Sequence, residues 1–388
     1  MRRNPRALLF ATYRLLCVGA LVLLATSASA ENLKVEASIA EKGQRDSNPL
    51  MLTRGAKELY GSVTTPTVTI TDNTPTTQLS AKISASENVY NQSNYNSTDG
   101  HAVTRLARQM TLWDVALGGT ADYDTTRSSE LTTLGFESAA TRHLGYSASP
   151  EISYRLTPLN RLGLSGNYLH SEYDSTTLTD YRTMSLTPSW THVFTPLNRG
   201  SISVLAQRYQ PLDYYNGRID TVGPSLEWVS ALTPRLTARL SGGTQATRRY
   251  DGSSPGQAWQ WDYVFSSNFS YNGEQDTTVL AATRAQQPYA NGTEFLLTTL
   301  SLQETHKFTP ALSLDVKASY QFSDSSAAAP GRLDSMWNGS AGLSYRITDR
   351  WDATTSYQYR HETLTGRSEA AQRNLIRVGF SFHTDARE

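Results

Sequence analysis

One turn motif recurs along this chain at a nearly constant interval. It starts with a threonine followed by proline or aspartate, and its instances begin at Thr157, Thr195, Thr233, Thr309 and Thr348. The steps between these threonines are 38, 38, 76 and 39 residues, and Asn272-Gly273, a strong two-residue hairpin signal, fills the double step. Such regularity constrains the whole fold, because every repeat must be the same kind of structural unit.

Half of this period is about 19 residues, which holds one tilted membrane-crossing strand of about 9–11 residues or a little more, plus a connection. Each repeat is therefore predicted to be a β-hairpin with a short turn at one end and a longer polar loop at the other. Candidate loops lie at 213–217, 251–256 and 325–331. This polarity is typical of outer-membrane barrels, whose short turns are periplasmic. A solenoid or a propeller is the alternative with this repeat length.

Apolar and polar residues alternate strictly between the turns. In 181–194, Met184, Leu186, Trp190 and Phe194 fall on one face, and Thr and Ser occupy the other. The same alternation runs through 112–123, 142–156, 257–271, 312–323 and 351–362. Period-two alternation indicates β-strands with one apolar face.

The positions of the aromatic residues distinguish a membrane barrel from a soluble β-sandwich, which alternates in the same way. One aromatic group lies near the short turns and comprises Tyr154, Phe194, Trp228, Phe308 and Trp351. A second group lies toward the loops and comprises Tyr168, Tyr173, Tyr209, Tyr250, Tyr320 and Tyr359. Two aromatic girdles around an aliphatic band are expected of a barrel that crosses two membrane interfaces.

The composition agrees with this interpretation. Only 38% of the residues are apolar and the mean hydropathy is −0.45, which is low for a soluble chain of 388 residues with one large core. No segment after residue 30 is long and apolar enough for a transmembrane helix. A barrel resolves the conflict, because only its outer face must be apolar. The predicted fold class is all-β, a transmembrane antiparallel up-and-down β-barrel.

Nine hairpins predict about 18 strands. The first strand, at 33–39, is expected to pair back through 62–71, and the last strand runs from about 372 to 382. An even strand number places both termini on the periplasmic side. Residues 31–71 form the least certain hairpin, and a barrel of 16 strands would result if they were a periplasmic arm or a plug.

The first thirty residues have the features of a secretory signal peptide. Basic residues at Arg2, Arg3, Arg6 and Arg14 precede an apolar stretch at 15–25, and Ala28-Ser29-Ala30 ends it. A lipoprotein signal acylated at Cys17 is the alternative, although Arg14 stands where such signals prefer an aliphatic residue. We expect cleavage of 1–30, with 31–388 forming the barrel in a bacterial outer membrane. The only cysteine leaves with the signal, so disulfides are excluded.

Three prolines conflict with the strand pattern. Pro150, Pro188 and Pro224 lie inside predicted strands, and proline cannot donate a ladder hydrogen bond. Bulges, or partner strands that end early, are expected there. The glycine pairs Gly118-Gly119 and Gly242-Gly243 are interpreted as places where strands bend or pack closely.

Little in the sequence points to catalysis, a cofactor or a metal. The seven histidines are scattered over different strands without a metal-binding spacing, and no glycine-rich phosphate loop is present. A Ser-His pair assembled from distant strands is the remaining enzymatic alternative. Without the four arginines of the signal, 31 basic residues face 35 acidic ones, so nucleic acid is not an expected partner.

The lumen is the candidate functional site. Strand parity directs a set of charged residues inward: Glu151, Arg155, Glu227, Arg239, Asp315, Lys317, Arg346, Asp352, Arg360 and Glu362. The signs are mixed, whereas a strongly ion-selective pore would show one dominant sign. These charges could simply pair across neighbouring strands. They could also, with the interior hydroxyls and amides, form a path for a neutral or weakly charged polar solute such as a glycan.

The string RHLGYSASPEISYRLTP at 142–158, followed by LGLS at 162–165 and by Tyr168 and Tyr173, resembles the β-barrel porins encoded beside exopolysaccharide and exosortase gene clusters. The segment QRDSNP at 44–49 is similar to the N-terminal Asp-Asn-Pro stretch of that family. The resemblance implies an outer-membrane location and a role in the export or assembly of exopolysaccharide. It carries no catalytic residues to transfer.

Three functions therefore compete at this stage, and the export or assembly of exopolysaccharide is the expected one. An export conduit would have outer-membrane lipids, polysaccharide and periplasmic export components as partners. A general diffusion porin for small polar solutes would narrow its lumen with a long inward loop, for which 126–141 is the only obvious candidate. A barrel enzyme, or a scaffold or adhesin without transport, is the third.

Overall fold

The computed structural model describes residues 33–127, 141–175, 177–212, 217–250, 257–289, 292–324, 333–365 and 369–384. The predicted signal peptide lies outside these residues, as do most of the loops expected at 213–217, 251–256 and 325–331. The strands are β1 (Leu33–Asp46), β2 (Leu59–Asn73), β3 (Thr77–Tyr90), β4 (Ser97–Gln109), β5 (Trp113–Thr125), β6 (Arg142–Thr157), β7 (Asn160–Tyr173), β8 (Tyr181–Thr195), β9 (Asn198–Pro211), β10 (Arg218–Thr233), β11 (Leu236–Tyr250), β12 (Gln260–Asn272), β13 (Asp276–Tyr289), β14 (Thr293–Lys307), β15 (Leu312–Asp324), β16 (Leu333–Arg346), β17 (Trp351–Leu364) and β18 (Ala371–His383). A short 3-10 turn, η1 (Ser93–Tyr95), lies between β3 and β4.

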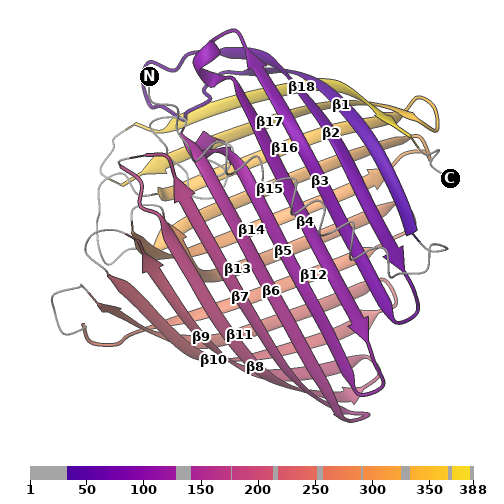
Figure 1. Cartoon of the computed structure of the whole chain (residues 1–388), viewed down its shortest axis with the longest axis vertical. Coiled ribbons are helices and arrows are strands. Elements are labelled where there is room, and N and C mark those ends of the chain that lie inside the picture. The colour runs from indigo at the N-terminus through magenta and orange to yellow at the C-terminus, as the bar shows by residue number, and fades with distance from the viewer. Residues whose placement is uncertain are drawn as a thin grey trace, which may run out of the picture.

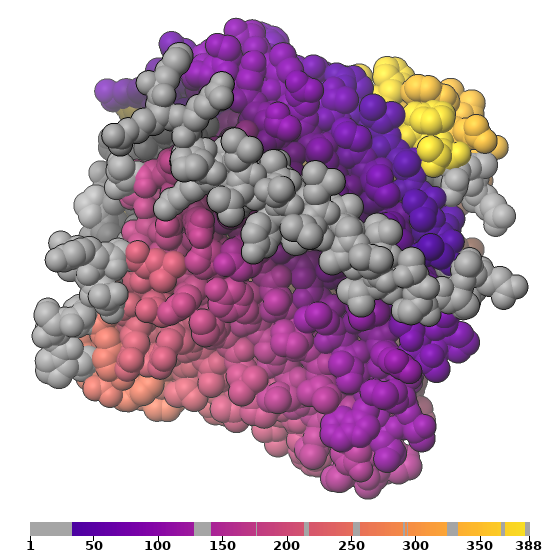
Figure 2. Space-filling view, in the orientation of Figure 1, coloured from indigo at the N-terminus to yellow at the C-terminus, as the bar shows by residue number. Residues whose placement is uncertain are grey.

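Each strand pairs antiparallel with its neighbours in the chain, and β1 pairs with β18 to close the sheet into a barrel. Figures 1 and 2 show the indigo first strands beside the yellow last strands at this seam. The predicted number of 18 strands is confirmed, and the 16-strand alternative is wrong because β1 and β2 both belong to the wall. Closure pairs the first strand with the last, so neither is left as an open edge, which a bilayer would not tolerate.

The seam is reinforced by the residues that follow β1. The Asn48 side chain donates to the Gln372 carbonyl oxygen at 2.9 Å and accepts from the Leu52 amide at 2.8 Å. Farther along this loop, Arg54 donates to Glu369 at 2.6 Å, and this hydrogen bond lowers the pKa of the Glu369 carboxyl. The connection between β1 and β2 is therefore fastened to the start of β18.

The two ends of the barrel differ. Short turns join the strands at the lower right of Figure 1, and the longer connections lie at the opposite end. The register pairs Leu33 with Asp72 and Ser38 with His383, so both ends of the described chain lie at the short-turn end. In barrels of this kind the short turns are periplasmic and the longer loops extracellular; the two ends are called the turn end and the loop end below.

Large apolar side chains cover the outer face. Trp190 is 41% exposed and Trp261 69% exposed, and Leu186, Leu226 and Leu240 are exposed between the two rims. In a bilayer this surface contacts lipid, so the architecture is that of an outer-membrane β-barrel. Within the described residues, no helix is long and apolar enough to cross a membrane.

The aromatic girdles need one correction. At the turn end, Phe194 stacks on Trp228 with ring centroids 5.2 Å apart, as expected for an outer girdle. Tyr173 and Tyr209, however, have the opposite parity to the exposed residues of their strands and are buried. They point into the barrel because their strands place them on the interior face, so they do not belong to the loop-end girdle.

The hydroxyl groups of the turn threonines explain why each repeat begins with this residue. The Thr233 hydroxyl accepts from the backbone amides of Arg235 and Leu236 at 3.2 and 3.0 Å. Equivalent bonds occur at the other four turns, at Thr157, Thr195, Thr309 and Thr348. A hydroxyl that accepts amides two and three residues ahead stabilises a tight turn locally.

The prolines do not produce the expected bulges. On one side, Pro150, Pro188 and Pro224 lie opposite Leu117, Leu164 and Val204 in an intact ladder. On the other side of each of these strands, two residue pairs are missing from the described ladder, and pairing then resumes in the same register. The same gap occurs beside Pro66 on β2. The bulge and early-ending alternatives are both wrong, because a long ladder holds its register across one missing donor.

Glycines allow the close approach at one of these gaps. A Cβ at Gly243 would overlap the carbonyl oxygen of Pro224, whereas a Cβ at Gly242 would have nothing within 4 Å. Gly223 on β10 has a similar restriction against the Thr244 carbonyl oxygen. The expectation that the 242–243 pair marks close packing therefore holds for Gly243 only.

The Gly243→Ala substitution is expected to lower the free energy of unfolding by about 2 kcal/mol, because two backbones must separate. Gly242→Ala is the matched control and should change it by less than about 0.5 kcal/mol. Urea unfolding of the barrel in lipid vesicles, followed by tryptophan fluorescence, measures both. Equal effects of the two substitutions would contradict the close approach.

A second test concerns the turns. Thr233→Val removes the acceptor of two amides and should lower the free energy of unfolding by about 1 kcal/mol. Thr233→Ser keeps the hydroxyl and should retain most of the stability in the same unfolding measurement. If serine cost as much as valine, the hydroxyl would not be the stabilising group.

Candidate functional site in the lumen

One hairpin leaves the barrel wall near the loop end. β12 pairs with β13 only as far as Phe265 opposite Arg284, although residues 260–264 continue to pair with β11. In the described ladders, the residues of β13 beyond Arg284 pair only with β14. These pairs run from Ala285 opposite Leu297 to Tyr289 opposite Thr293. We call residues 285–289 and 292–295 the tip hairpin.

The tip hairpin reaches β9, four strands along the wall. Tyr209 donates its hydroxyl hydrogen to the Tyr289 carbonyl oxygen at 3.1 Å, and Gln207 donates its amide to Glu294 at 3.1 Å. Both donors lie on β9, on the face opposite the exposed Ile202 and Val204. Three strands separate β9 from β13 in the sheet, so the contacts are made across the barrel interior.

Buried clusters support both sets of contacts. On the β7–β10 side, Tyr173, Tyr181 and Ile219 form a buried cluster around Tyr209, the donor to Tyr289. At the hairpin itself, a second buried cluster packs against Tyr289 and consists of Phe295, Leu297, Leu333 and Met336. The hairpin is thus held inside the lumen, which it narrows.

This constriction was not predicted. The expected candidate was 126–141, of which 128–140 lie outside the described residues; Thr126 and Arg127, at its start, are buried. The sequence carries a local signal, because Gln286 and Pro288 stand at outward positions that are apolar in the wall strands, but its anchors on β9 lie about 80 residues away.

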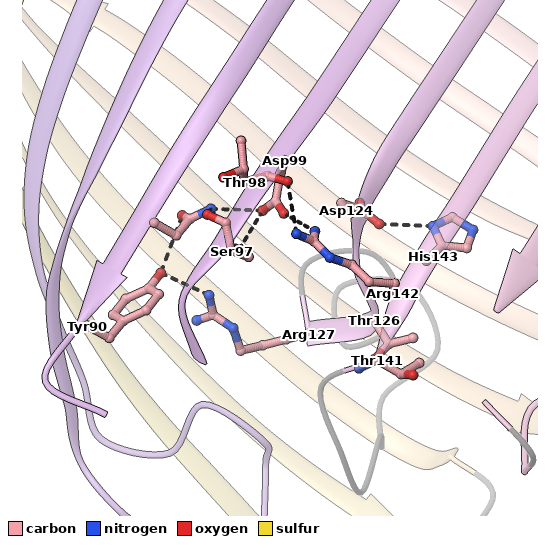
Figure 3. Close-up of polar contacts among 11 residues, drawn as sticks. Tyr90, Ser97, Thr98, Asp99, Asp124, Thr126, Arg127, Thr141, Arg142 and His143 are labelled. Atoms are coloured by element: carbon pink, nitrogen blue, oxygen red, sulfur yellow. Dashed lines mark hydrogen bonds and ion pairs between the residues drawn. The ribbon is translucent and has the colours of Figure 1, made fainter. Parts of the chain in front are cut away.

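A polar network surrounds Tyr90 on the interior face of β3. Its hydroxyl accepts from Gln44 at 2.7 Å and from Arg127 at 2.9 Å. The Arg127 guanidinium also lies over the Tyr90 ring, 4.8 Å from its centroid. Tyr90 thus connects β1, β3 and the segment after β5. Figure 3 shows its contact with Arg127.

Asp99 is the second centre of this network. Its carboxylate accepts from Asn88 at 2.9 Å, Ser97 at 3.2 Å and Arg142 at 2.8 Å (Figure 3). Nearby, the ring of His143 contacts Asp124 at 2.9 Å, and both side chains are buried. These fully bonded carboxylates fix the shape of the lumen wall near the loop end.

A group of basic side chains occupies the interior face of β17, β18 and β1. Arg373 forms two contacts with Asp46, at 3.0 and 2.6 Å, and Arg377 donates to Gln44 at 3.3 Å. Arg360 and Glu362 are buried beside them. The group as a whole comprises Lys42, Arg127, Arg360, Arg373 and Arg377, which lie within electrostatic range of one another, and the carboxylates Asp46 and Glu362. We call it the basic wall.

All ten residues predicted for the lumen lie on the strand faces opposite the exposed apolar residues. Several pair with other interior residues: Arg105–Glu151 at 3.3 Å, Arg155–Asp114 at 2.8 Å, Arg239–Glu227 at 3.7 Å, Thr305–Asp315 at 2.6 Å and His383–Asp352 at 3.1 Å. Arg346 lies opposite Asp352 in the register, and Lys317 lies opposite Gln303 and Ser340. Only Arg360 and Glu362 join the basic wall.

The larger part of the basic wall was missed. Arg373 and Arg377 are four residues apart in the last strand, with the outward Ile376 and Val378 between and after them. Applying the same parity to that strand would have placed both arginines inside. The expectation of a lumen without a dominant sign is therefore incomplete, because the positive charge is concentrated on one side.

A serine–histidine contact lies near the turn end of β18. Ser381 and Asp352 both contact the same nitrogen of His383, Nε2, at 3.4 and 3.1 Å. A nucleophile triad needs the serine and the carboxylate on opposite ring nitrogens. Within the described residues, no group of three or more potential ligand side chains could hold a metal ion. A recess of about 790 Å³ at the turn end, lined in part by Arg346, Asp352 and His383, is open to the lumen.

No protein-family model matches the chain, and no curated protein matches its sequence. Among solved structures, the barrel is similar to OccK2 (OpdF) of Pseudomonas aeruginosa, with a TM-score of 0.50 and 8% identity over 92% of this chain and 98% of that one. A complex of OccK2 with glucuronate has a TM-score of 0.50 and 9% identity over 92% of this chain and 100% of that one. A BenF-like porin from Pseudomonas fluorescens Pf-5 has a TM-score of 0.50 and 9% identity over 91% of this chain and 99% of that one. At such low identity the likeness shows a shared fold.

The anchors of the tip hairpin can be tested by Tyr209→Phe, which removes the hydroxyl donated to Tyr289. Loss of about 1 kcal/mol should raise the population of an unlatched, higher-conductance state roughly fivefold in single-channel recordings. Tyr168→Phe, on the outer face, is the control and should leave the recordings unchanged. Identical traces for Tyr209→Phe and the wild type would show that this bond does not hold the constriction.

Proposed function

We propose that the chain is an outer-membrane diffusion channel for small polar solutes. The observation that carries the proposal is the tip hairpin, which narrows a polar lumen without being part of the wall. A fixed constriction sets an upper size for the solute, as the inward loop of a diffusion porin does. The similarity in fold to a BenF-like porin supports this function.

The export of exopolysaccharide finds less support. A polymer conduit needs continuous clearance along its axis, whereas the tip hairpin is held inside the lumen by its hydrogen bonds to β9 and by a buried cluster at Tyr289. No contact in the described residues is specific to a glycan chain. The alternative of a general porin for small solutes therefore fits the geometry better than the conduit.

The basic wall suggests which small solutes pass most readily. Guanidinium groups bind carboxylates through paired, charge-assisted hydrogen bonds. Five basic side chains face two carboxylates on this side of the lumen, so the local field favours anions. Glucuronate, which OccK2 binds, is a small carboxylate of the proposed kind. We therefore include small organic anions among the preferred solutes.

The test is reconstitution of the purified barrel in a planar bilayer with a KCl gradient across it. We expect discrete open channels and a reversal potential that indicates preference for the anion. In water, a unit charge about 10 Å from a passing monovalent ion changes its energy by about 0.4 kcal/mol, or about twofold in relative permeability. Arg377→Gln should lower the anion preference by this factor.

Arg235→Gln serves as the control, because Arg235 pairs with Glu274 at a short turn outside the lumen. It should leave the reversal potential unchanged. A barrel without channel activity would refute the porin function. Open channels that also translocate exopolysaccharide would favour the conduit instead.

A further inference from the structure

The outer face carries a group of arginines at the loop end of β8–β11. Arg182, Arg208, Arg218 and Arg248 share the parity of exposed apolar residues on their strands, such as Met184, Val204, Val222 and Leu240. Their side chains therefore point away from the lumen. These four residues, with Asp220, are called the arginine row.

Three members of the row lie directly opposite one another across neighbouring strands. Arg208 on β9 pairs in register with Asp220 on β10, which pairs in register with Arg248 on β11. Arg208 contacts the Asp220 carboxylate at 2.7 and 3.3 Å, and Arg218 contacts it at 3.3 Å. One carboxylate thus serves two guanidinium groups.

The other described contacts of Arg182 and Arg218 are with neutral groups. Arg182 donates twice to the amide oxygen of Gln210, at 3.0 and 2.7 Å. The guanidinium groups of Arg218 and Arg248 lie over the Tyr250 ring, 4.1 and 4.9 Å from its centroid. Arg208 and Arg218 thus share the Asp220 carboxylate, and both keep about half of their side-chain area exposed.

The row lies at the edge of the apolar band. Leu186, Ala206 and Val222 form the next outward-facing row, two residues toward the middle of the strands, which is about 7 Å along a strand. Leu186 and Val222 are exposed there, and Trp261 on β12 is exposed beside them. Lipid-facing charge is unfavourable in hydrocarbon and tolerated near the interface. The guanidinium groups therefore lie at headgroup level.

The opposite rim of the same strands is different. Its outward residues include His192, Phe194, Trp228 and Leu236, and the described strand residues there include no outward arginine. The positive charge is thus confined to the leaflet on the loop side, which is extracellular in barrels of this kind.

We propose that the arginine row binds the phosphate groups of a phosphorylated glycolipid of the outer leaflet, with the acyl chains of that lipid along Leu186 and Val222. A guanidinium fork matches two phosphate oxygens, and several forks in one row suit a headgroup with more than one phosphate. The exposed aliphatic row beneath supplies the complementary surface for the chains. This binding is independent of the channel function, because the row lies outside the lumen.

The test uses the full-length barrel, purified and folded in detergent, with bis-phosphorylated lipid A as the probe and native mass spectrometry as the readout. The variant combines Arg182→Gln, Arg208→Gln and Arg218→Gln. It should bind lipid A at least about tenfold more weakly, because each basic side chain near a membrane surface contributes to anionic-lipid binding. Heat-modifiable gel mobility verifies that each variant is folded.

The matched control combines Arg45→Gln, Arg54→Gln and Arg235→Gln. It changes the net charge equally, and each of these arginines pairs with its own glutamate away from the row. It should bind lipid A like the wild type. Equal binding by the row variant and the wild type would overturn the proposal.

Two further binding measurements identify the source of the phosphate and the role of the lipid. Dephosphorylated lipid A should bind the wild type as weakly as lipid A binds the row variant. Inorganic phosphate in excess should displace little lipid A. Undiminished binding of the dephosphorylated lipid, or complete displacement by free phosphate, would each refute a glycolipid site.

Discussion

The pairing of every backbone amide and carbonyl is the constraint on which this structure depends. In hydrocarbon an unpaired peptide group has no water to bind, so a sheet can cross the membrane only as a closed ring. The β1–β18 ladder provides that closure, and Asp46 and Asn48 fasten it from the end of β1 to β18. Four prolines interrupt single ladders without moving the register, since the remaining bonds of each long strand keep it in place.

The same constraint explains where the barrel departs from regularity. Near the loop end a hairpin can leave the wall if its peptide groups find other partners. β13 and β14 do so: beyond Arg284 they keep their own mutual hydrogen bonds, while Tyr209 and Gln207 on β9 bind the tip hairpin inside the barrel. The features that give the channel its character are thus located where the membrane no longer dictates the architecture.

Much of the fold could be predicted from the sequence, because lipid and water impose a period-two code on each strand and threonine marks each short turn. The inward parity of residues such as Glu151 and Arg239 followed from that code. The tip hairpin was not found in this way: Gln286 and Pro288 break the outward apolar pattern, but the pattern does not identify the partners of the hairpin, which are distant in the chain. The basic wall was missed at Arg373 and Arg377, where the code was available but the charges come together only through the closure of β18 onto β1.

That closure has a consequence for how the molecule is made. Hairpins such as β8–β9 join residues that are neighbours in the chain, and each can form as soon as its own segment is available. The seam instead joins Ser38 to His383, the first strand to emerge from the ribosome and the last. Contacts of such high sequence separation form slowly because a long loop must be closed first. Until β1 and β18 pair, the sheet has two unpaired edges, and in this interval it is most liable to pair with another chain.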